Sequence, residues 1–124
     1  MLSLSIIVRN EEARLADCLA SVEGFADEMV VVDTGSTDGT VAIAEAAGAR
    51  VEQIEWPGDF APARNTGLTF LRGDWVLVLD ADERLRPEVI PALKALMAQP
   101  DVLVINLLRY EVGAAMAPYS SVSR

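Results

Sequence analysis

The sequence predicts an α/β fold built on a largely parallel sheet, and two observations carry this prediction. Short apolar, β-branched runs alternate with segments of helical spacing along the 124 residues, as four strand–helix pairs and a last strand. Continuous apolar strands are typical of parallel sheets, because helices cover both faces of such a sheet. The expected strands are residues 4–8, 29–32, 51–54, 75–79 and 102–108.

Helical periodicity marks the segments between these strands. In the first helix, apolar residues recur at Leu15, Cys18, Leu19 and Val22, which lie on one helix face. Glycine follows three of the four helical segments, as is common where helices end. The expected helices are residues 11–22, 40–47, 61–71 and 87–98, and residues 113–124 show no clear pattern.

The composition excludes several classes of function. Nineteen acidic residues against ten basic ones give a net charge of −9, and the scattered cations form no patch for nucleic acid. The absence of histidine excludes Ser-His-Asp and Cys-His catalysis and the usual zinc sites. The single cysteine, Cys18, excludes a disulfide scaffold. Because we find neither a membrane span nor a signal peptide, we expect a cytoplasmic protein.

Two aspartates, Asp80 and Asp82, directly follow the expected strand 75–79. Ligands of parallel sheets bind at the carboxyl ends of the strands. Mg²⁺ and Mn²⁺ bind one or two carboxylates together with phosphate oxygens, so one aspartate could hold a metal while the other binds a sugar hydroxyl. The alternative is a loop whose carboxylates cap the following helix. The residues by themselves leave both interpretations open.

The Asp-Thr-Gly-Ser run at 33–36 also follows a strand and allows three interpretations. It could be a turn in which Thr37 or Asp38 caps the next helix, or Asp33 could bind a nucleobase or ribose. The same run is also typical of a homodimeric aspartic protease, but that fold is all-β and lacks the four helices expected here. A haloacid-dehalogenase phosphatase is excluded, because Ser36 stands where that family requires an aspartate.

Three more charged residues are candidates for the site. Arg64 opens the expected helix 61–71 and could meet phosphate or a base edge at the helix start. A surface ion pair with Asp59 is the alternative. Glu11 and Glu12 follow the first strand and could favour the positive end of the first helix, a role that suits Glu12 better.

Four motifs together resemble the family 2 glycosyltransferases of the GT-A fold. They occur in the expected order and span residue 4 to about residue 96, and the closest resemblance is to the branch with lipopolysaccharide-core glucosyltransferases and peptide S-glycosyltransferases. The resemblance implies a Rossmann-like α/β sandwich with a mostly parallel sheet. The motifs are LSIIVRNEE at 4–12, VVVDTGSTDGT at 30–40, ARNTG at 63–67 and GDWVLVLDADE at 73–83.

The resemblance also implies a site for a nucleoside-diphosphate sugar, usually a UDP-sugar, with Mn²⁺ or Mg²⁺. By the same resemblance Asp82 would ligate the metal, while Asp80 would touch the ribose or donor sugar. Asp33 would contact the uracil or ribose, and Arg64 would lie over the nucleotide. Arg9 departs from the small, hydroxyl or lysine residue of many members, which leaves the nucleoside edge of the pocket less defined. The uridine would be walled by Val8, Arg9, Asn10 and Glu11.

The activity implied by the resemblance is inverting glycosyl transfer in cell-envelope polysaccharide biosynthesis. A hydroxyl or thiol of an acceptor glycan, lipid-linked sugar or peptide would attack the anomeric carbon while a carboxylate takes its proton. Family members carry that base well beyond the Asp-x-Asp motif, and only the 42 residues 83–124 follow it here. We therefore assign no catalytic residue.

The short segment after Asp82 sets our expectation for the domain. Residues 1–124 should form a single nucleotide-sugar-binding domain, truncated at the C-terminal side and without the acceptor-binding part. Truncation would uncover an apolar face, which a homodimer could cover. Peripheral membrane association is a further expected partnership. A non-catalytic nucleotide-binding or interaction module of the same fold is the alternative function.

Overall fold

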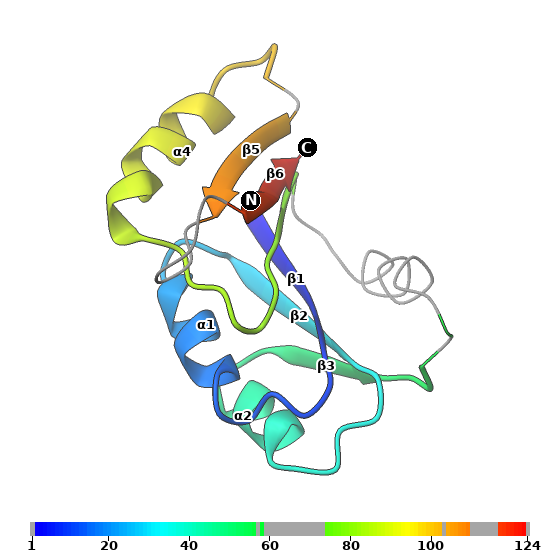
Figure 1. Ribbon diagram of the computed structural model, residues 1–124. Helices are drawn as coiled ribbons and strands as arrows, with labels where there is room; N and C mark the ends of the chain where they lie inside the picture. The colour runs from blue at the N-terminus through cyan, green and yellow to red at the C-terminus, as the bar shows by residue number, and fades with distance from the viewer. Residues whose placement is uncertain (1, 57, 59–73, 103, 110–116, 124) are drawn as a thin grey trace.

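The computed structural model describes residues 2–56, 58, 74–102, 104–109 and 117–123. In these residues six strands form one sheet in the order β3-β2-β1-β4-β6-β5 (Figure 1). Four strands run parallel, and β6 lies antiparallel between β4 and β5. The predicted α/β fold with a mostly parallel sheet is confirmed. The strands are β1 (Leu2–Val8), β2 (Glu28–Asp33), β3 (Arg50–Gln53), β4 (Trp75–Val78), β5 (Val104–Arg109) and β6 (Ala117–Ser123).

The helices α1 (Leu15–Ser21), α2 (Thr40–Ala46) and α4 (Ile90–Met97) lie on the same side of the sheet in Figure 1. A short 3₁₀ turn, η1 (Pro87–Val89), leads into α4. None of the helices in the described ranges is long and apolar enough to cross a membrane. The apolar face of α1 predicted from its spacing is confirmed, because Leu15, Cys18, Leu19 and Val22 are all buried against the sheet.

The first strand, β1, lies at the centre of the parallel part of the sheet. Six of its seven residues are buried, which explains why its sequence is a nearly continuous apolar run. From β1 the chain first adds β2 and β3 on one side and later β4 on the other. The strand order therefore reverses at β1, and ligands of open α/β sheets bind outside the carboxyl ends of the strands at such a point.

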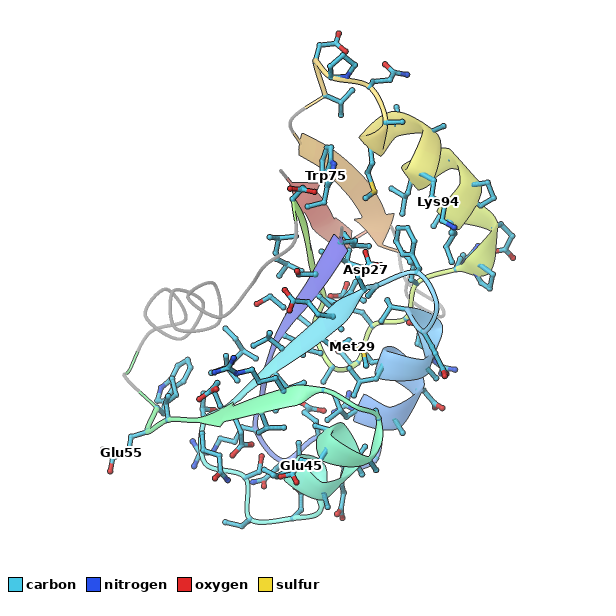
Figure 2. All side chains as sticks on the ribbon, turned by 180° about the vertical axis from the view of Figure 1, so that it is seen from behind. Asp27, Met29, Glu45, Glu55, Trp75 and Lys94 are labelled. Atoms are coloured by element: carbon cyan, nitrogen blue, oxygen red, sulfur yellow. The ribbon has the colours of Figure 1, made fainter. Side chains whose placement is uncertain are left out.

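The opposite end of the sheet is closed by local contacts. The Leu2 amide donates to Asp27 Oδ2 at 2.6 Å, and Ser3 Oγ donates to Glu28 Oε1 at 2.5 Å. Figure 2 shows Asp27 and Trp75 at this amino-terminal end of the strands, far from Glu55 at the other end. The carboxyl-terminal end of the sheet is therefore the end to search for a site.

The structure adds one element to the prediction and shifts the bounds of others, including the helix expected at 87–98, which is α4 preceded by η1. No element was predicted in residues 113–124, but β6 occupies part of this range. Its sequence, APYSSVS, is too rich in serine to read as a strand, and it forms one by pairing with neighbours on both sides. The first helix begins at Leu15 rather than residue 11, and the third strand ends at Gln53 rather than residue 54. The predicted helix 61–71 lies outside the described residues.

Candidate functional site

A cleft opens at the carboxyl ends of β1 and β4, with a volume of about 460 Å³. It lies where the strand order reverses, as the topology predicts. Five of the predicted site residues line it: Val8, Arg9, Glu11, Asp80 and Asp82. The other lining residues among those described are Ile7, Arg14, Thr34, Trp56 and Ala81.

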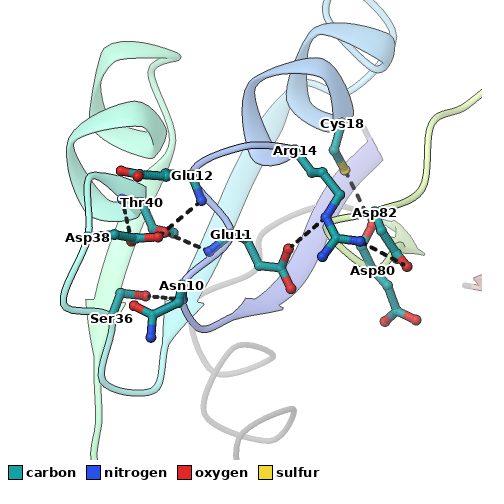
Figure 3. A network of polar contacts seen from close by, with 10 residues as sticks. All are labelled: Asn10, Glu11, Glu12, Arg14, Cys18, Ser36, Asp38, Thr40, Asp80 and Asp82. Carbon is teal, nitrogen blue, oxygen red and sulfur yellow. Dashed lines mark hydrogen bonds and ion pairs between the residues drawn. The ribbon is translucent and has the colours of Figure 1, made fainter.

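Three carboxylates and the guanidinium groups of Arg9 and Arg14 give the cleft its electrostatic character. Arg14 lies between two of the carboxylates (Figure 3), with Nε 3.4 Å from Glu11 Oε2 and Nη1 3.9 Å from Asp82 Oδ2. The side chains of Arg14 and Asp82 are 61% and 57% exposed, so this pairing contributes little to folding stability. The charges instead influence which ligands enter the cleft, since two guanidinium groups do not fully neutralise three carboxylates.

Glu11 Oε2 is the clearest sign of a binding function in the cleft. The oxygen is shielded from solvent and accepts no hydrogen bond from the described residues, although 26% of the side chain is exposed. Its proximity to Arg14 is an ion pair without hydrogen-bond alignment. Buried polar atoms in native proteins are nearly always satisfied, so an oxygen of this kind favours a donor or cation supplied by a ligand.

Asn10 departs from its predicted place in the cleft wall. Its backbone φ is +52°, which turns the chain sharply at the end of β1. The backbone amide of Asn10 donates to Ser36 Oγ at 2.9 Å, and the backbone amide of Thr37 donates to the side-chain Oδ1 of Asn10 at 2.7 Å. Asn10 thus fastens the loop after β1 to the loop after β2 and is not among the residues that line the cleft.

The residues after Asn10 extend this connection between the two loops. The amide of Glu11 donates to Thr40 Oγ1 at 2.9 Å, and the Gly39 amide donates to Glu12 Oε2 at 2.7 Å. Asp38 accepts from the Glu12 amide at 3.3 Å and from the Thr40 amide at 3.0 Å. A further hydrogen bond from the Thr40 hydroxyl lowers the pKa of Asp38. Together these bonds direct Glu12 toward α2 and leave Glu11 facing the cleft (Figure 3).

Asp33 is buried beneath the turn that follows β2, with 1% of its surface exposed. Its Oδ2 accepts from the Gly35 and Ser36 amides at 3.4 and 3.2 Å, and its Oδ1 accepts from the Ser36 hydroxyl. The neighbouring Thr34 lines the cleft, and Asp33 is not among the lining residues. The aspartic protease interpretation is wrong, because that fold has no parallel sheet flanked by helices.

The loop carrying Asp80 and Asp82 is closed on itself. The Asp80 amide donates to Glu83 Oε1 at 2.6 Å, and the Glu83 amide donates to the Asp80 carbonyl at 2.9 Å. The predicted alternative, that these carboxylates cap the next helix, finds no support. The turn η1 follows Arg86 and has no side-chain cap. Asp82 is therefore left to face the cleft.

Cys18 packs directly beneath this loop. Its Sγ lies 3.6 Å from the carbonyl oxygen of Asp80. Burial, followed by the charges of Glu83, Asp82 and Asp80, raises the pKa of the Cys18 thiol to about 12. The thiol therefore stays protonated at neutral pH and acts as a hydrogen-bond donor rather than a nucleophile.

The carboxylates suit a hard divalent cation that is shared with a ligand. The described residues contain no group of three or more acidic or cysteine side chains close enough to hold a metal alone. Mg²⁺ and Mn²⁺ commonly take one or two carboxylates and complete their coordination with phosphate oxygens and water. Asp82 and the unsatisfied Glu11 oxygen provide oxygen donors of that kind.

Five lining residues were not predicted from the sequence, and three of them, Arg14, Trp56 and Thr34, have polar or aromatic side chains. Arg14 lies four residues before Cys18, and that helical spacing places it beside the loop after β4. Trp56 is 39% exposed just after β3, and its Trp-Pro-Gly context was a signal for an aromatic side chain on a loop. Thr34 lies next to Asp33, and nothing else in the sequence marked it as a site residue. Arg64, which was predicted, lies outside the described residues.

Comparisons with known proteins identify relatives of this chain. The sequence model described as Glycosyl transferase family 2 matches residues 3–124. A TPR repeat-containing protein of Synechococcus elongatus is 48% identical over 122 residues, which are 98% of this chain and 30% of that protein. The lipopolysaccharide core biosynthesis glycosyltransferase LpsC of Rhizobium meliloti is 40% identical over 108 residues, 83% of this chain and 39% of LpsC.

Solved structures show the same fold. Residues 1–349 of S. aureus TarS in complex with UDP align with a TM-score of 0.82 and 26% identity, over 94% of this chain and 38% of that one. Glucosyl-3-phosphoglycerate synthase of Mycobacterium tuberculosis, in complex with Mn²⁺, UDP and glucosyl-3-phosphoglycerate, aligns with a TM-score of 0.67 and 27% identity. That alignment covers 84% of this chain and 42% of the synthase. This chain spans well under half the length of each of these proteins.

Proposed function

This chain belongs to glycosyltransferase family 2, and from that premise we propose that it binds a UDP-sugar together with Mn²⁺ or Mg²⁺ for inverting transfer to an acceptor. One observation carries the proposal. Carboxylates from the end of β1 and from the loop after β4 face a single cleft, with Arg14 between two of them. The relatives that were solved with UDP and with Mn²⁺ support the same choice of ligands.

Six of the ten described residues that line the cleft have an assigned role in this proposal. Asp82 holds the cation, and Asp80 binds a hydroxyl of the ribose or donor sugar. Val8, Arg9 and Glu11 wall the nucleoside, and Trp56 contributes an aromatic face at the rim. The unsatisfied Glu11 oxygen accepts a hydrogen bond from the ligand. Asn10 acts from behind the wall by fixing its turn.

Two assignments rest on the family resemblance alone. Asp33 contacts the uracil or ribose, although its carboxylate is engaged by its own turn. A ligand contact by Asp33 therefore requires that turn to rearrange. Arg64 lies over the nucleotide. Both assignments are tested by substitution rather than by the contacts described above.

The proposed reaction combines the roles of these residues with a base outside them. When bound, the cation neutralises charge that develops on the leaving diphosphate. The cleft residues hold the donor so that an acceptor hydroxyl or thiol reaches the anomeric carbon from the opposite side. A carboxylate outside the residues assigned here accepts the acceptor's proton. We propose a glycan, lipid-linked sugar or peptide acceptor, a cytoplasmic location and a role in building cell-envelope polysaccharide.

Calorimetric titration of UDP, with and without Mn²⁺, tests donor binding. We expect UDP to bind more tightly with Mn²⁺, and Asp82→Asn to abolish that difference while the fold is kept. Asp101→Asn removes an exposed carboxylate in the turn after α4 and is the matched control. Equal binding by Asp82→Asn in Mn²⁺ would overturn the metal role. A folded wild-type chain that binds no UDP in either condition would favour the non-catalytic interaction module.

A further inference from the structure

We propose that α1 positions the loop at residues 80–85, and that Cys18 and Ser21 are positioning residues for Asp80 and Asp82. The proposal rests on the proposed function, since it concerns how the same cleft is shaped. It gives a role to Cys18, which is buried, and to Ser21, which is half-buried, although neither side chain lines the cleft.

The spacing of three residues along α1 is the first argument. Arg14, the N-cap residue of α1, is followed by Cys18 and Ser21 at intervals of four and three, so the three residues lie along one face of the helix. Each contacts a different part of the same loop, namely Asp82, the Asp80 carbonyl and the Leu85 amide. The face of α1 that carries these side chains therefore follows the loop from its first residue to its last.

The contacts fix the two ends of the loop. At its start, the Cys18 thiol donates to the Asp80 carbonyl over 3.6 Å. At its end, the Leu85 amide donates to Ser21 Oγ at 3.0 Å, while the Ser21 hydroxyl donates to the Cys18 carbonyl at 2.6 Å. Ser21 therefore joins the loop to the backbone of α1 through one hydroxyl that both accepts and donates.

Burial distinguishes the end of the loop, which is fixed in the core, from the exposed Asp82. Leu85 is 6% exposed and belongs to the core, whereas the Asp82 side chain is 57% exposed. The loop thus presents Asp82 between two points that are attached to α1. A ligand of a small divalent cation must sit within a few tenths of an ångström of its required place. Loosening either attachment should therefore weaken cation-dependent binding more than binding of the nucleotide alone.

The test compares Ser21→Ala with Ser21→Thr by titrating UDP with and without Mn²⁺. Ser21→Ala removes the hydrogen bond from the Leu85 amide together with the bond to the Cys18 carbonyl within α1. The loss of the loop attachment should weaken UDP binding in Mn²⁺ by about three- to tenfold, and leave binding without Mn²⁺ unchanged. Ser21→Thr keeps the hydroxyl and should restore the affinity. The matched control is Ser3→Ala, which also removes a serine hydrogen bond but at the amino-terminal end of the sheet.

A second substitution, Cys18→Ala, detaches the start of the loop and keeps the proposal testable if Ser21→Ala does not fold. We expect a larger loss of UDP affinity with Mn²⁺ than without it, since Cys18 holds Asp80, which is proposed to bind a hydroxyl of the ribose or donor sugar. The proposal is overturned if folded variants bind UDP as the wild type does, or lose affinity equally with and without Mn²⁺. A wild-type chain without Mn²⁺-dependent UDP binding would instead overturn the proposed function. Circular dichroism and thermal unfolding establish that each variant is folded.

Discussion

Replacing Arg14 with glutamine should make the cleft bind Mn²⁺ more tightly in the absence of UDP. Arg14 is the cation between Glu11 and Asp82, with its Nη1 3.9 Å from Asp82 Oδ2 and its Nε 3.4 Å from Glu11 Oε2. An incoming cation needs the same carboxylate oxygens and is repelled by the guanidinium. Arg14→Gln removes the charge but keeps a polar side chain, so the competition is lost without a large change in volume.

The magnitude follows from the distance and the exposure. Charges 3.9 Å apart attract by about 1 kcal/mol in water and about 4 kcal/mol at an effective dielectric constant near 20. Because both side chains are more than half exposed, the lower figure applies. An energy of about 1 kcal/mol corresponds to about a fivefold change in the Mn²⁺ dissociation constant. Added salt should reduce the difference, since it screens exposed charges.

Electron paramagnetic resonance of free Mn²⁺, measured during a titration at low ionic strength without UDP, is the assay. The control is Arg50→Gln, which removes the same charge from an exposed ion pair with Glu52 on β3. We expect tighter Mn²⁺ binding in Arg14→Gln only. If its affinity is unchanged or lower, or if Arg50→Gln has the same effect, the guanidinium does not compete for Asp82.

Three other predictions concern single residues. Asp33→Ala should weaken the binding of both UDP and uridine, with or without Mn²⁺. A loss of affinity for UDP with unchanged affinity for uridine would refute the assignment of Asp33 to the base or ribose. Cys18 should resist Ellman's reagent from pH 7 to 9 until the protein unfolds, since the pKa of its thiol is about 12, and rapid labelling of folded protein would contradict its burial. Leu77→Ala, at a position with no exposed surface, should lower the free energy of unfolding by about 2–5 kcal/mol in urea, and a loss under 1 kcal/mol would place Leu77 outside the core.

The fold was predictable where burial dominates the choice of residues. β1 is buried almost throughout, so its composition alone marks a strand. The face of α1 was likewise visible in its apolar spacing. β6 could not be found in this way, because the hydrogen bonds of β4 and β5 on both sides of it, rather than its own apolar content, make it a strand. Propensity is a weak guide where pairing supplies the stabilisation.

The site was predictable at the level of chain segments. The strand order brings the ends of β1 and β4 together, and the cleft is found there with Arg9, Glu11, Asp80 and Asp82 in its lining. The rule that ligands bind at the carboxyl ends of parallel strands predicts which segments of the backbone lie at the site. It contains no information on Arg14, which reaches the cleft from the start of a helix whose first residue was predicted four positions too early.

The direction of each side chain depends on the turn that carries it, and the end of β2 shows why. In the pairing of β1 with β2, Asp33 lies opposite Val8. A prediction based only on the ends of strands therefore places both residues in the site. Val8 reaches the cleft, whereas Asp33 accepts hydrogen bonds from the turn at 35–36 and stays buried. Gly35 takes a φ of +119°, which lets that turn fold back over the carboxylate. A substitution of Asp33 therefore changes both the shape of the turn and any contact with a nucleoside. For this reason its effect must be compared between uridine and UDP, and with the unfolding free energy of the same variant.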